Sequence, residues 1–505
     1  MTSPASADFQ NLTKRFRNWS LLNSCASLLG WDERTYLPPG GVNHRADQMA
    51  LLARMSHEWL TSPETADLLA RVESQPENSH HDVDSEATIR EIRRTQHRAA
   101  KLPRRLVEEL AACVIHSQQA WQEARQANKF ELFQPWLEKI VALKREEAHA
   151  VGFKDVPYDA LLDEYEPGAT TRSISALFAG LRAELTPLIA SIAASGRRPD
   201  KTILERSFVP ERQEEFGKLA AGRIGFDFEA GRLDVTTHPF CSSIGPGDCR
   251  ITTRYHPNRF TDGFFGILHE AGHGIYEQGL DPQQFGLPLG TYTSLGIHES
   301  QSRLWENQVG RGRPFWDYFY PLAQQSYPES LGSVRFDDFY AAVNDVRPSF
   351  IRIEADEATY NLHIILRFEL EEALIKGALQ PAEVPGAWNE KFRQFFGIVP
   401  PDAAQGCLQD IHWSMGGLGY IPTYTLGNLY AAQFMEQVRK DLPDLDDDFR
   451  HGEFGRLKSW LNARIHIQGM RYRPGDLCER ITGKPLSHQP LMTYLREKFG
   501  QLYGV

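Results

Sequence analysis

Apolar residues recur near a 3.6-residue period over most of the chain, which is the pattern of amphipathic helices. The first part of the chain shows this pattern at residues 8–29, 43–60, 85–100, 103–128, 133–152, 171–194 and 210–224. Pro103 begins one of these segments, where a proline is tolerated because the first helical N–H has no partner within the helix. Helical patterning resumes at Gly263 and continues to the end. The sequence therefore predicts a mainly α-helical protein.

One stretch, residues 232–255, departs from the helical period. Residues 233–237 alternate between apolar and polar side chains, and residues 250–255 are rich in threonine and β-branched residues. Both features are typical of strands, and a loop containing Gly-Pro-Gly-Asp lies between them. We expect two short strands that form a small antiparallel sheet just before the next helix.

Composition and charge narrow the class of protein. Hydrophobic residues make up 41% of the chain and charged residues 24%, as in ordinary soluble globular proteins. The net charge is −11 with no basic run, so nucleic acid is not an expected partner. The apolar stretch 174–194 contains Arg182, Glu184 and Pro187, which favours a core helix over a membrane span. No membrane association is therefore expected.

The chain carries no internal repeat, low-complexity tract or long linker, so we expect one domain over residues 1–505. Its first residues have no basic start and no apolar core, so no signal peptide is expected and the predicted location is the cytoplasm. Six cysteines are scattered along the chain without a Cys-x-x-Cys pair. Cys241 and Cys249 could pair as a disulfide, but a cytosolic chain favours free thiols.

The segment from Gly266 to Gly274 contains the pattern His-Glu-x-x-His. His269 and His273 are four residues apart, so on a helix they share a face and can bind one ion. Two imidazoles and a third ligand suit Zn²⁺, with one position left open for chemistry. Glu270 is then the expected general base that takes a proton from the attacking water.

The residues around this pattern favour the metal-site interpretation over two histidines on a solvated helix face. The flanks are apolar, which indicates a buried helix where unpaired His and Glu would be costly; they include Phe264, Phe265, Ile267, Leu268, Ile275 and Tyr276. Gly272 and Gly274 are poor helix formers. We expect them to allow the close approach of another backbone or of substrate.

A third ligand is available on the next predicted helix, in the segment Gly-Ile-His-Glu-Ser-Gln-Ser. The first helix is expected to end near Gly279, and a loop with proline and glycine leads to the second. Glu299 then lies in the first turns of that helix and is the predicted third ligand. The other interpretation is an acidic residue that complements the helix dipole. Glu306 is the alternative ligand, although its position suggests a surface residue.

The chain resembles the carboxypeptidase Taq family of thermostable metallocarboxypeptidases. Beyond the zinc helix, motifs of this family occur in order as His238-Pro239-Phe240, Asp248-Cys249-Arg250-Ile251-Thr252, His298-Glu299-Ser300-Gln301, Ile351-Arg352-Ile353-Glu354-Ala355-Asp356 and Gly406-Cys407-Leu408-Gln409-Asp410-Ile411-His412-Trp413. Further matches at Trp31-Asp32 and at residues 158–163 extend the resemblance to nearly the whole chain. The resemblance implies a large helical body with a deep active-site groove, similar to neurolysin and angiotensin-converting enzyme. It also implies Zn²⁺ or Co²⁺ and a homodimer.

The resemblance also suggests roles for residues outside the metal helix. His412, Tyr420 and Tyr424 are candidate hydrogen-bond donors, and the resemblance favours His412 and, less directly, Tyr424 as donors to the oxyanion. The alternative for His412 is a core residue bonded to Asp410 or to a backbone carbonyl. Arg352 is the first candidate for binding the terminal carboxylate of a substrate, since its fork matches a carboxylate. A salt bridge to Glu354 or Asp356 is the alternative, and Arg347 is another candidate cation.

Two further residues are candidates for substrate contact. Arg250 could bind substrate, although pairing with Asp248 to organise its loop is favoured. His238 could contact substrate because Pro239 restrains the adjacent backbone. Asp356 is a candidate to hydrogen-bond a ligand histidine, with Glu354 or Glu357 as alternatives.

The predicted activity is zinc-dependent removal of single residues from peptide carboxyl termini. By the family resemblance, specificity is broad and carboxyl-terminal Pro is disfavoured. The alternatives are an endo-oligopeptidase or dipeptidyl carboxypeptidase of the same helical build, and a non-catalytic metal-binding helical protein. The presence of Glu270 counts against the last, since a site that only binds metal needs no general base.

Overall fold

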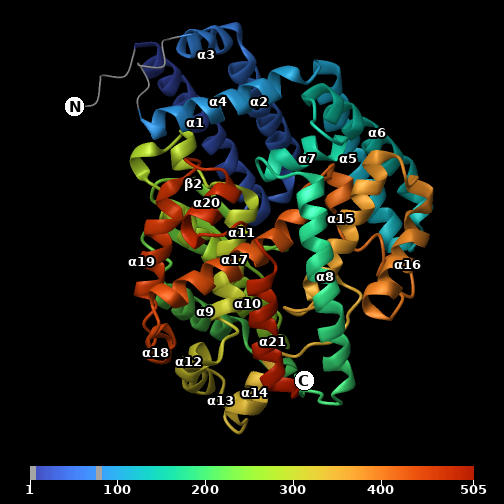
Figure 1. Ribbon diagram of the computed structural model, residues 1–505, viewed down its shortest axis with the longest axis vertical. Helices are drawn as coiled ribbons and strands as arrows, with labels where there is room; N and C mark the ends of the chain where they lie inside the picture. Colours follow the sequence, from blue (N-terminus) through green and yellow to red (C-terminus); the bar gives the residue numbers. More distant parts are fainter. Residues whose placement is uncertain (1–6, 75–81) are drawn as a thin grey trace. The chain divides into compact units, whose positions relative to one another are not determined.

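The structure is a computed structural model that describes residues 7–74 and 82–505. Helices dominate it, which confirms the mainly α-helical prediction (Figure 1). The chain divides into two compact units: one comprises Met1–Ala100, Asp200–Val343 and Phe434–Gly483, and the other Lys101–Pro199, Asn344–Gln433 and Lys484–Val505. The single domain over the whole chain and the likeness to neurolysin stay predictions.

The first unit contains the predicted metal helix and the sheet. Its helices are α1 (Ala7–Thr35), α2 (Val42–Thr61), α3 (Pro63–Ser74), α4 (Val83–Lys101), α9 (Pro210–Ile224), α10 (Phe260–Gln278), α11 (Leu295–Arg303), α12 (Arg313–Ser326), α13 (Pro328–Leu331), α14 (Phe336–Val343), α18 (Leu445–Arg450), α19 (Gly455–Arg464) and α20 (Pro474–Thr482). A π-helix, η7 (Leu304–Val309), follows α11 directly.

The second unit is helical over most of its length. Its helices are α5 (Arg104–Ala127), α6 (Gln134–Val151), α7 (Pro157–Tyr165), α8 (Thr171–Ala194), α15 (Tyr360–Lys376), α16 (Val384–Phe396) and α21 (Gln489–Tyr503). Helix α17 (Pro422–Asp441) begins in this unit and ends in the first. The helices expected at residues 103–128, 133–152 and 171–194 are therefore present.

Helix α8 is the one described helix that is long and apolar enough to cross a membrane. Its buried residues instead recur every three or four positions along one face, with exposed residues between them; they are Thr171, Ile174, Phe178, Leu181, Leu185, Ile189 and Ile192. One buried stripe is the pattern of a helix packed against a protein core.

The sheet has three strands and differs from the antiparallel pair that the sequence predicts. Strands β1 (Gly231–Val235) and β3 (Asp248–Thr253) are parallel neighbours, and β2 (Cys241–Gly245) pairs antiparallel with β3 from the other side. The Gly-Pro-Gly-Asp segment therefore joins β2 to β3. Strand β2 was not predicted, because its sequence, Cys-Ser-Ser-Ile-Gly, shows little apolar alternation and contains a glycine.

Aromatic packing fixes the start of α10, the predicted metal helix. The ring of Phe260 stacks on that of Phe264, and Phe264 stacks in turn on Phe216 of α9, with ring centroids 5.2 and 5.3 Å apart. Trp316 of α12 lies 5.3 Å from Phe264. Because these rings are buried, they anchor the helix that carries the metal-site residues.

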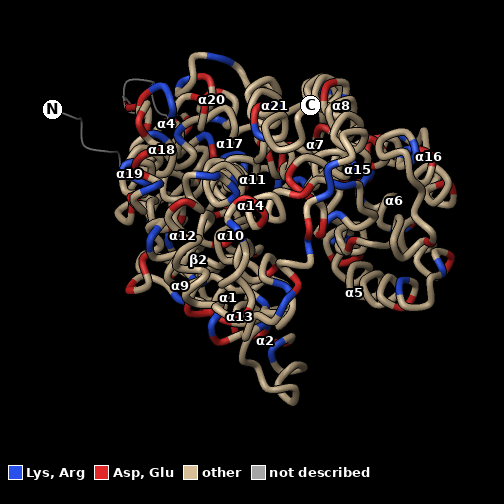
Figure 2. The backbone as a smooth tube through the Cα atoms, turned by 90° about the horizontal axis from the view of Figure 1, so that it is seen from below, with Lys and Arg blue, Asp and Glu red and all other residues tan. Residues whose placement is uncertain are grey.

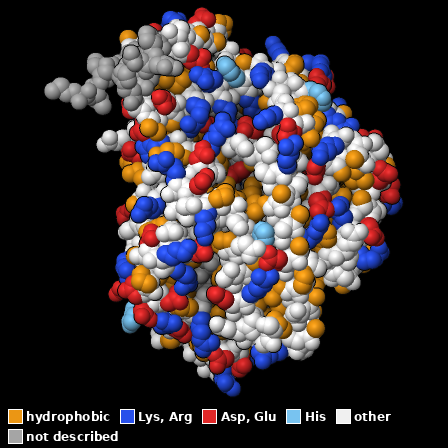
Figure 3. Space-filling view, viewed as in Figure 1, with side chains coloured by type: hydrophobic (Ala, Val, Ile, Leu, Met, Phe, Trp, Pro, Cys, Tyr) orange, Lys and Arg blue, Asp and Glu red, His pale blue; other side chains and the backbone are white. Residues whose placement is uncertain are grey.

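Acidic and basic residues are interspersed along the backbone in Figure 2 and on the face drawn in Figure 3. This agrees with the mixed charge pattern of the sequence. Interspersed charges of both signs produce no large field of one sign.

Candidate metal centre and active site

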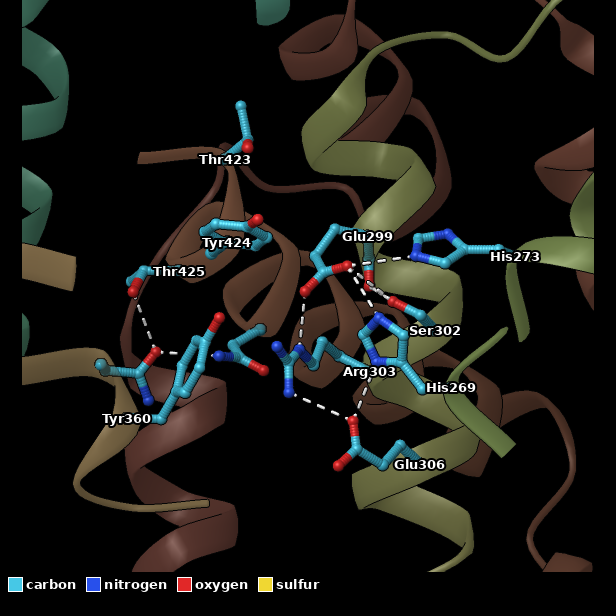
Figure 4. Close-up of polar contacts among 12 residues, drawn as sticks. His269, His273, Glu299, Ser302, Arg303, Glu306, Tyr360, Thr423, Tyr424 and Thr425 are labelled. Carbon is cyan, nitrogen blue, oxygen red and sulfur yellow. Dashed lines mark hydrogen bonds and ion pairs between the residues drawn. The ribbon is translucent and has the colours of Figure 1, made fainter. Parts of the chain in front are cut away.

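His269, His273 and Glu299 converge on one point in the first unit. Nε2 of His269 lies 3.6 Å from Oε2 of Glu299, and Nε2 of His273 lies 3.3 Å from the same oxygen. One donor atom from each of the three residues lies within 4.8 Å of the other two. Figure 4 shows both imidazoles directed at the Glu299 carboxylate. Two nitrogens and one carboxylate oxygen in this arrangement suit a divalent ion such as Zn²⁺.

The protonation states of two of these groups favour metal binding. Burial is the main reason that the pKa of His273 falls to about 3, so its imidazole is neutral and has a free lone pair. Burial alone would raise the pKa of Glu299, but Arg303 and the two histidines outweigh it and hold that pKa well below its usual range. Glu299 is therefore ionised. A neutral imidazole and an anionic carboxylate are the forms that metals require. Burial alone would lower the pKa of His269, but Glu299 and Glu306 outweigh it and raise that pKa, so the proton on His269 must leave when a metal binds.

Two glycines bring the elements of this site together, and at Gly272 the neighbour is another backbone, as the sequence predicted. A Cβ added at Gly272 would lie 2.6 Å from the carbonyl oxygen of Gln301 and 2.7 Å from Cα of Ser302, both on α11. A Cβ at Gly274 would lie 2.5 Å from the ring of Phe226 and 3.3 Å from Ile251 of β3. The absence of side chains therefore lets α10 approach both α11 and the sheet.

Glu306 is buried and contacts His269, a candidate ligand, so the expectation of a surface residue is wrong. Its Oε2 lies 2.9 Å from Nδ1 of His269. The error arises because Glu306 lies in the π-helix η7, where all six residues are buried and no solvated face exists. A carboxylate on the second nitrogen of a ligand histidine fixes the tautomer and the orientation of the ring. Glu306, and not Asp356, occupies that position.

Arg303 and Ser302 hold the Glu299 carboxylate by hydrogen bonds, and neither contact was predicted from the sequence. Nε of Arg303 donates to Oε1 of Glu299 at 2.7 Å, and Oγ of Ser302 donates to Oε2 at 2.8 Å. Nη1 of Arg303 also donates to Oε2 of Glu306 at 3.1 Å (Figure 4). Their spacing of three and four residues from Glu299 on one helix was the signal that could have identified them.

Glu270, the predicted general base, is buried beside the ligand histidines. Burial is the first cause that raises its pKa to about 7, with further contributions from Glu299 and Glu306; His269 opposes the rise. In the metal-free protein both the protonated and the ionised form of this carboxyl are therefore populated near neutral pH. Such a group can both accept and return a proton.

His238 and Arg250 also belong to the first unit. Arg250 donates through Nε and Nη2 to both oxygens of Asp248, at 2.7 and 2.8 Å, and its guanidinium lies 4.1 Å from the ring centre of Trp31. The pairing with Asp248 is the one that the sequence favoured. His238 is exposed in the segment between β1 and β2.

The second unit brings together two of its predicted residues, His412 and Tyr424. Nε2 of His412 lies 3.1 Å from the hydroxyl of Tyr424. Burial lowers the pKa of His412 to about 3, so the ring is neutral. Its Nδ1 is buried and has no hydrogen-bond partner within residues 7–74 and 82–505.

Arg352 forms a salt bridge, but its partner is Asp410 and neither Glu354 nor Asp356. Nε and Nη2 of Arg352 donate to the two oxygens of Asp410 at 2.8 and 3.0 Å, and Nη1 donates to the Tyr360 hydroxyl at 2.9 Å. The Asp356 carboxylate instead accepts hydrogen bonds from nearby backbone and from the Thr359 hydroxyl.

Arg347, the other candidate cation of this unit, pairs with Asp345. Its side chain is 45% exposed, whereas that of Arg352 is 7% exposed. The two arginines therefore differ in how easily a ligand could reach them.

Comparison with known proteins places this chain in a family. The family model described as carboxypeptidase Taq (M32) metallopeptidase matches residues 11–499. Thermostable carboxypeptidase 1 of Thermus thermophilus is 46% identical, with 99% of each chain covered. Carboxypeptidase 1 of Bacillus subtilis is 37% identical, with 98% of each chain covered. The crystal structure of the M32 carboxypeptidase from Deinococcus radiodurans matches with a TM-score of 0.96 and 39% identity, over 99% of this chain and 100% of that one. The chain therefore belongs to the carboxypeptidase Taq (M32) family of metallopeptidases and is a peptide hydrolase that acts at carboxyl termini.

Proposed function

We propose that this protein is a zinc-dependent carboxypeptidase that removes single residues from peptides with broad specificity and disfavours carboxyl-terminal Pro. The observation that carries the proposal is the convergence of His269, His273 and Glu299 beside the buried carboxyl of Glu270. Zn²⁺ held by these three ligands would supply Lewis-acid polarisation of the scissile carbonyl and a lower pKa for the attacking water. Co²⁺ could use the same donors.

Glu270 is the proposed general base and then the general acid. It takes a proton from the attacking water and delivers that proton to the nitrogen of the departing residue. Burial favours the neutral form of this carboxyl and a bound Zn²⁺ would favour its ionised form, so both the form that accepts the proton and the form that returns it are within reach. Glu306 keeps His269 oriented throughout, and Arg303 with Ser302 keeps Glu299 oriented.

His412 and Tyr424 are the proposed hydrogen-bond donors to the oxyanion that forms when water attacks. The neutral imidazole and the hydroxyl carry one proton each, and their mutual contact at 3.1 Å uses one of the two, so one group donates to the oxyanion while the other holds it in one orientation. Preorganised donors of this kind stabilise developing negative charge.

Arg352 is the proposed anchor for the terminal carboxylate of the substrate, with His238 and Arg250 as further substrate contacts. A guanidinium has five N–H groups, and Asp410 and Tyr360 take three of them from Arg352. The two that remain, one on each Nη atom, could bind a carboxylate. Arg347 is the competing candidate because it is more exposed.

A pair of peptides tests this proposal. The zinc-loaded protein should release residues one at a time from a peptide with a free carboxyl terminus and leave its carboxyl-terminal amide uncut, as followed by mass spectrometry. Equal cleavage of both peptides would overturn the carboxypeptidase assignment in favour of an endo-oligopeptidase. The variant Arg352→Ala should lose the discrimination together with activity on the free acid, by about 2–4 kcal/mol in transition-state stabilisation. An unchanged acid-to-amide ratio would transfer the role to Arg347 or Arg250.

We further propose that the protein acts in the cytoplasm as a homodimer. The resemblance to the family supports this assignment. Light scattering of the purified protein should give twice the chain mass of 57.4 kDa, and a monomer mass would overturn it.

A further inference from the structure

Two cysteines face each other across the small sheet of the first unit. Cys241 lies on β2, opposite Ile251, and Cys249 lies on β3, opposite Ser243. The two cysteines are therefore diagonal neighbours, and they lie on the same face of the antiparallel pair. Their Sγ atoms are 3.6 Å apart, close enough for one thiol to donate a hydrogen bond to the other.

The pair lies against the metal helix. Sγ of Cys249 is 3.9 Å from the carbonyl oxygen of Gly274, the residue after the ligand His273. Cys249 is 2% exposed, whereas Cys241 is only partly buried. Cys241, on the edge strand β2, is therefore the more accessible of the two cysteines, and a reagent would meet Cys249 only after Cys241.

We propose that Cys241 and Cys249 are a reversible dithiol/disulfide pair that closes by exchange with a small disulfide such as oxidised glutathione. The thiolate of Cys241 attacks one glutathione sulfur, and the first glutathione thiolate leaves. Cys249 then attacks Sγ of Cys241 and displaces the second. One S–S bond forms in the protein, one breaks in the oxidant, and two electrons pass to glutathione. The two cysteine protons end on the two glutathione thiols.

Closure would join the edge strand β2 (labelled in Figure 1) covalently to β3, on the side where α10 packs. A Cβ at Gly274 of α10 would lie only 3.3 Å from the side chain of Ile251 on β3, so the helix packs closely on the sheet and the cross-link stiffens the surface that supports the metal helix. The proposal does not depend on zinc or on the assigned activity, because its test measures covalent chemistry alone.

Both cysteines lie in one tryptic peptide, Leu233 to Arg250, because Arg250 is its only Lys or Arg. A disulfide between them therefore stays within a single peptide. The native full-length protein is incubated with oxidised glutathione, quenched with iodoacetamide and digested without reduction. The peptide is expected to lose the mass of two hydrogen atoms, to carry no alkyl group, and to recover both thiols after dithiothreitol. The pKa of the Cys241 thiol is raised, first by its hydrogen bond with Cys249 and then by burial, so the reaction must be followed to equilibrium.

Two variants make the test specific. Cys249→Ser should stop at the mixed disulfide of Cys241 with glutathione, because the second attacking thiol is missing. Cys25→Ser, which removes an exposed cysteine of α1, should close as fully as the parent protein. Hydrogen exchange of the β2 amides should slow after oxidation of the parent and not of Cys249→Ser. Two results for the parent protein would overturn the proposal, provided that Cys25 reacts with the same reagent. In one, the peptide that holds Cys241 and Cys249 stays a dithiol. In the other, that peptide carries glutathione and forms no internal disulfide.

Discussion

The imidazole of His298 lies flat against the imidazole of His273, with ring centroids 4.3 Å apart and planes 16° apart. Nε2 of His298 is in turn 2.9 Å from Oε1 of Glu277, on the same helix as His273. Nδ1 of His273 is buried without a hydrogen-bond partner in the described part of the chain. The two imidazoles of the candidate metal site are thus oriented differently: His269 by a hydrogen bond to Glu306, and His273 by a stacked ring.

We expect His298→Ala to weaken zinc binding, because it removes the ring that holds His273 in place. A stacked aromatic pair is worth about 0.5–1.5 kcal/mol, which corresponds to a rise in the zinc dissociation constant of about two- to tenfold. His298→Phe keeps the ring and should retain most of the affinity. Chelator competition measures both variants. Equal loss in the two would show that the bond to Glu277 matters more than the stacked ring.

Replacing Glu306 should weaken metal binding without removing a ligand. We expect Glu306→Ala to raise the zinc dissociation constant about 10–100-fold, as for other residues that orient a ligand histidine. Glu306→Gln should have a smaller effect, since its amide oxygen can still accept from Nδ1 of His269. Glu329→Gln is the matched control because the Glu329 side chain is 71% exposed and forms an exposed ion pair with Arg212. Unchanged affinity in Glu306→Ala would remove this role.

Substitutions of Glu270 and of Glu299 should distinguish a loss of catalysis from a loss of metal binding. We expect Glu270→Gln to keep a full complement of zinc and to lose at least about a thousandfold in turnover, since the general base is gone. Glu299→Ala should instead lose zinc, because it removes a ligand. Metal analysis beside a peptide assay distinguishes the two. Full zinc content and activity in Glu299→Ala would show that the third ligand lies elsewhere.

Local patterns predicted much of this site, and tertiary packing determined the rest. The His-Glu-x-x-His spacing placed His269 and His273 on one helix face, and the loop after α10 placed Glu299 near the start of α11. These relationships depend on helical periodicity and on end signals that a sequence carries. For Arg352 a substrate carboxylate was the first expectation, and a salt bridge to Glu354 or Asp356 was the alternative. The salt bridge in the structure is to Asp410, which lies far along the chain, where a local pattern cannot reveal it. Glu306 was expected at the surface, but it lies in a π-helix whose six residues are all buried, which helical periodicity does not predict.

Acidification should destabilise the second unit through Asp410. Burial alone would raise its pKa, but Arg352 and Arg367 hold it well below the usual value. A depressed pKa means that the ion pair stabilises the fold above the unfolded-state pKa of about 4 and that this contribution is lost as the pH falls below it. Asp410→Asn should therefore cost about 3–5 kcal/mol near neutral pH and flatten the acid limb of the stability curve. Asp447→Asn is the control, since Asp447 forms an exposed ion pair with Arg450. Denaturant titrations of this variant should give a nearly unchanged unfolding free energy and a nearly unchanged acid limb.

The separation of α10 from α11 should respond to a single methyl group at Gly272. An added Cβ would meet the backbone of Gln301 and Ser302 at 2.6 and 2.7 Å, and neither can rotate away. We expect Gly272→Ala to cost about 1–3 kcal/mol in unfolding free energy. It should also weaken zinc binding, because α11 carries Glu299 away from the two histidines.

Gly266→Ala on the same helix is the matched control, since its Cβ would lie 3.5 Å from Oγ1 of Thr253, an ordinary contact. The higher helix propensity of alanine should make that control neutral or more stable, by up to about 1 kcal/mol. Thermal melts with chelator competition measure both variants. If Gly272→Ala matched Gly266→Ala in stability and in zinc affinity, close contact between the helices would not be what positions Glu299.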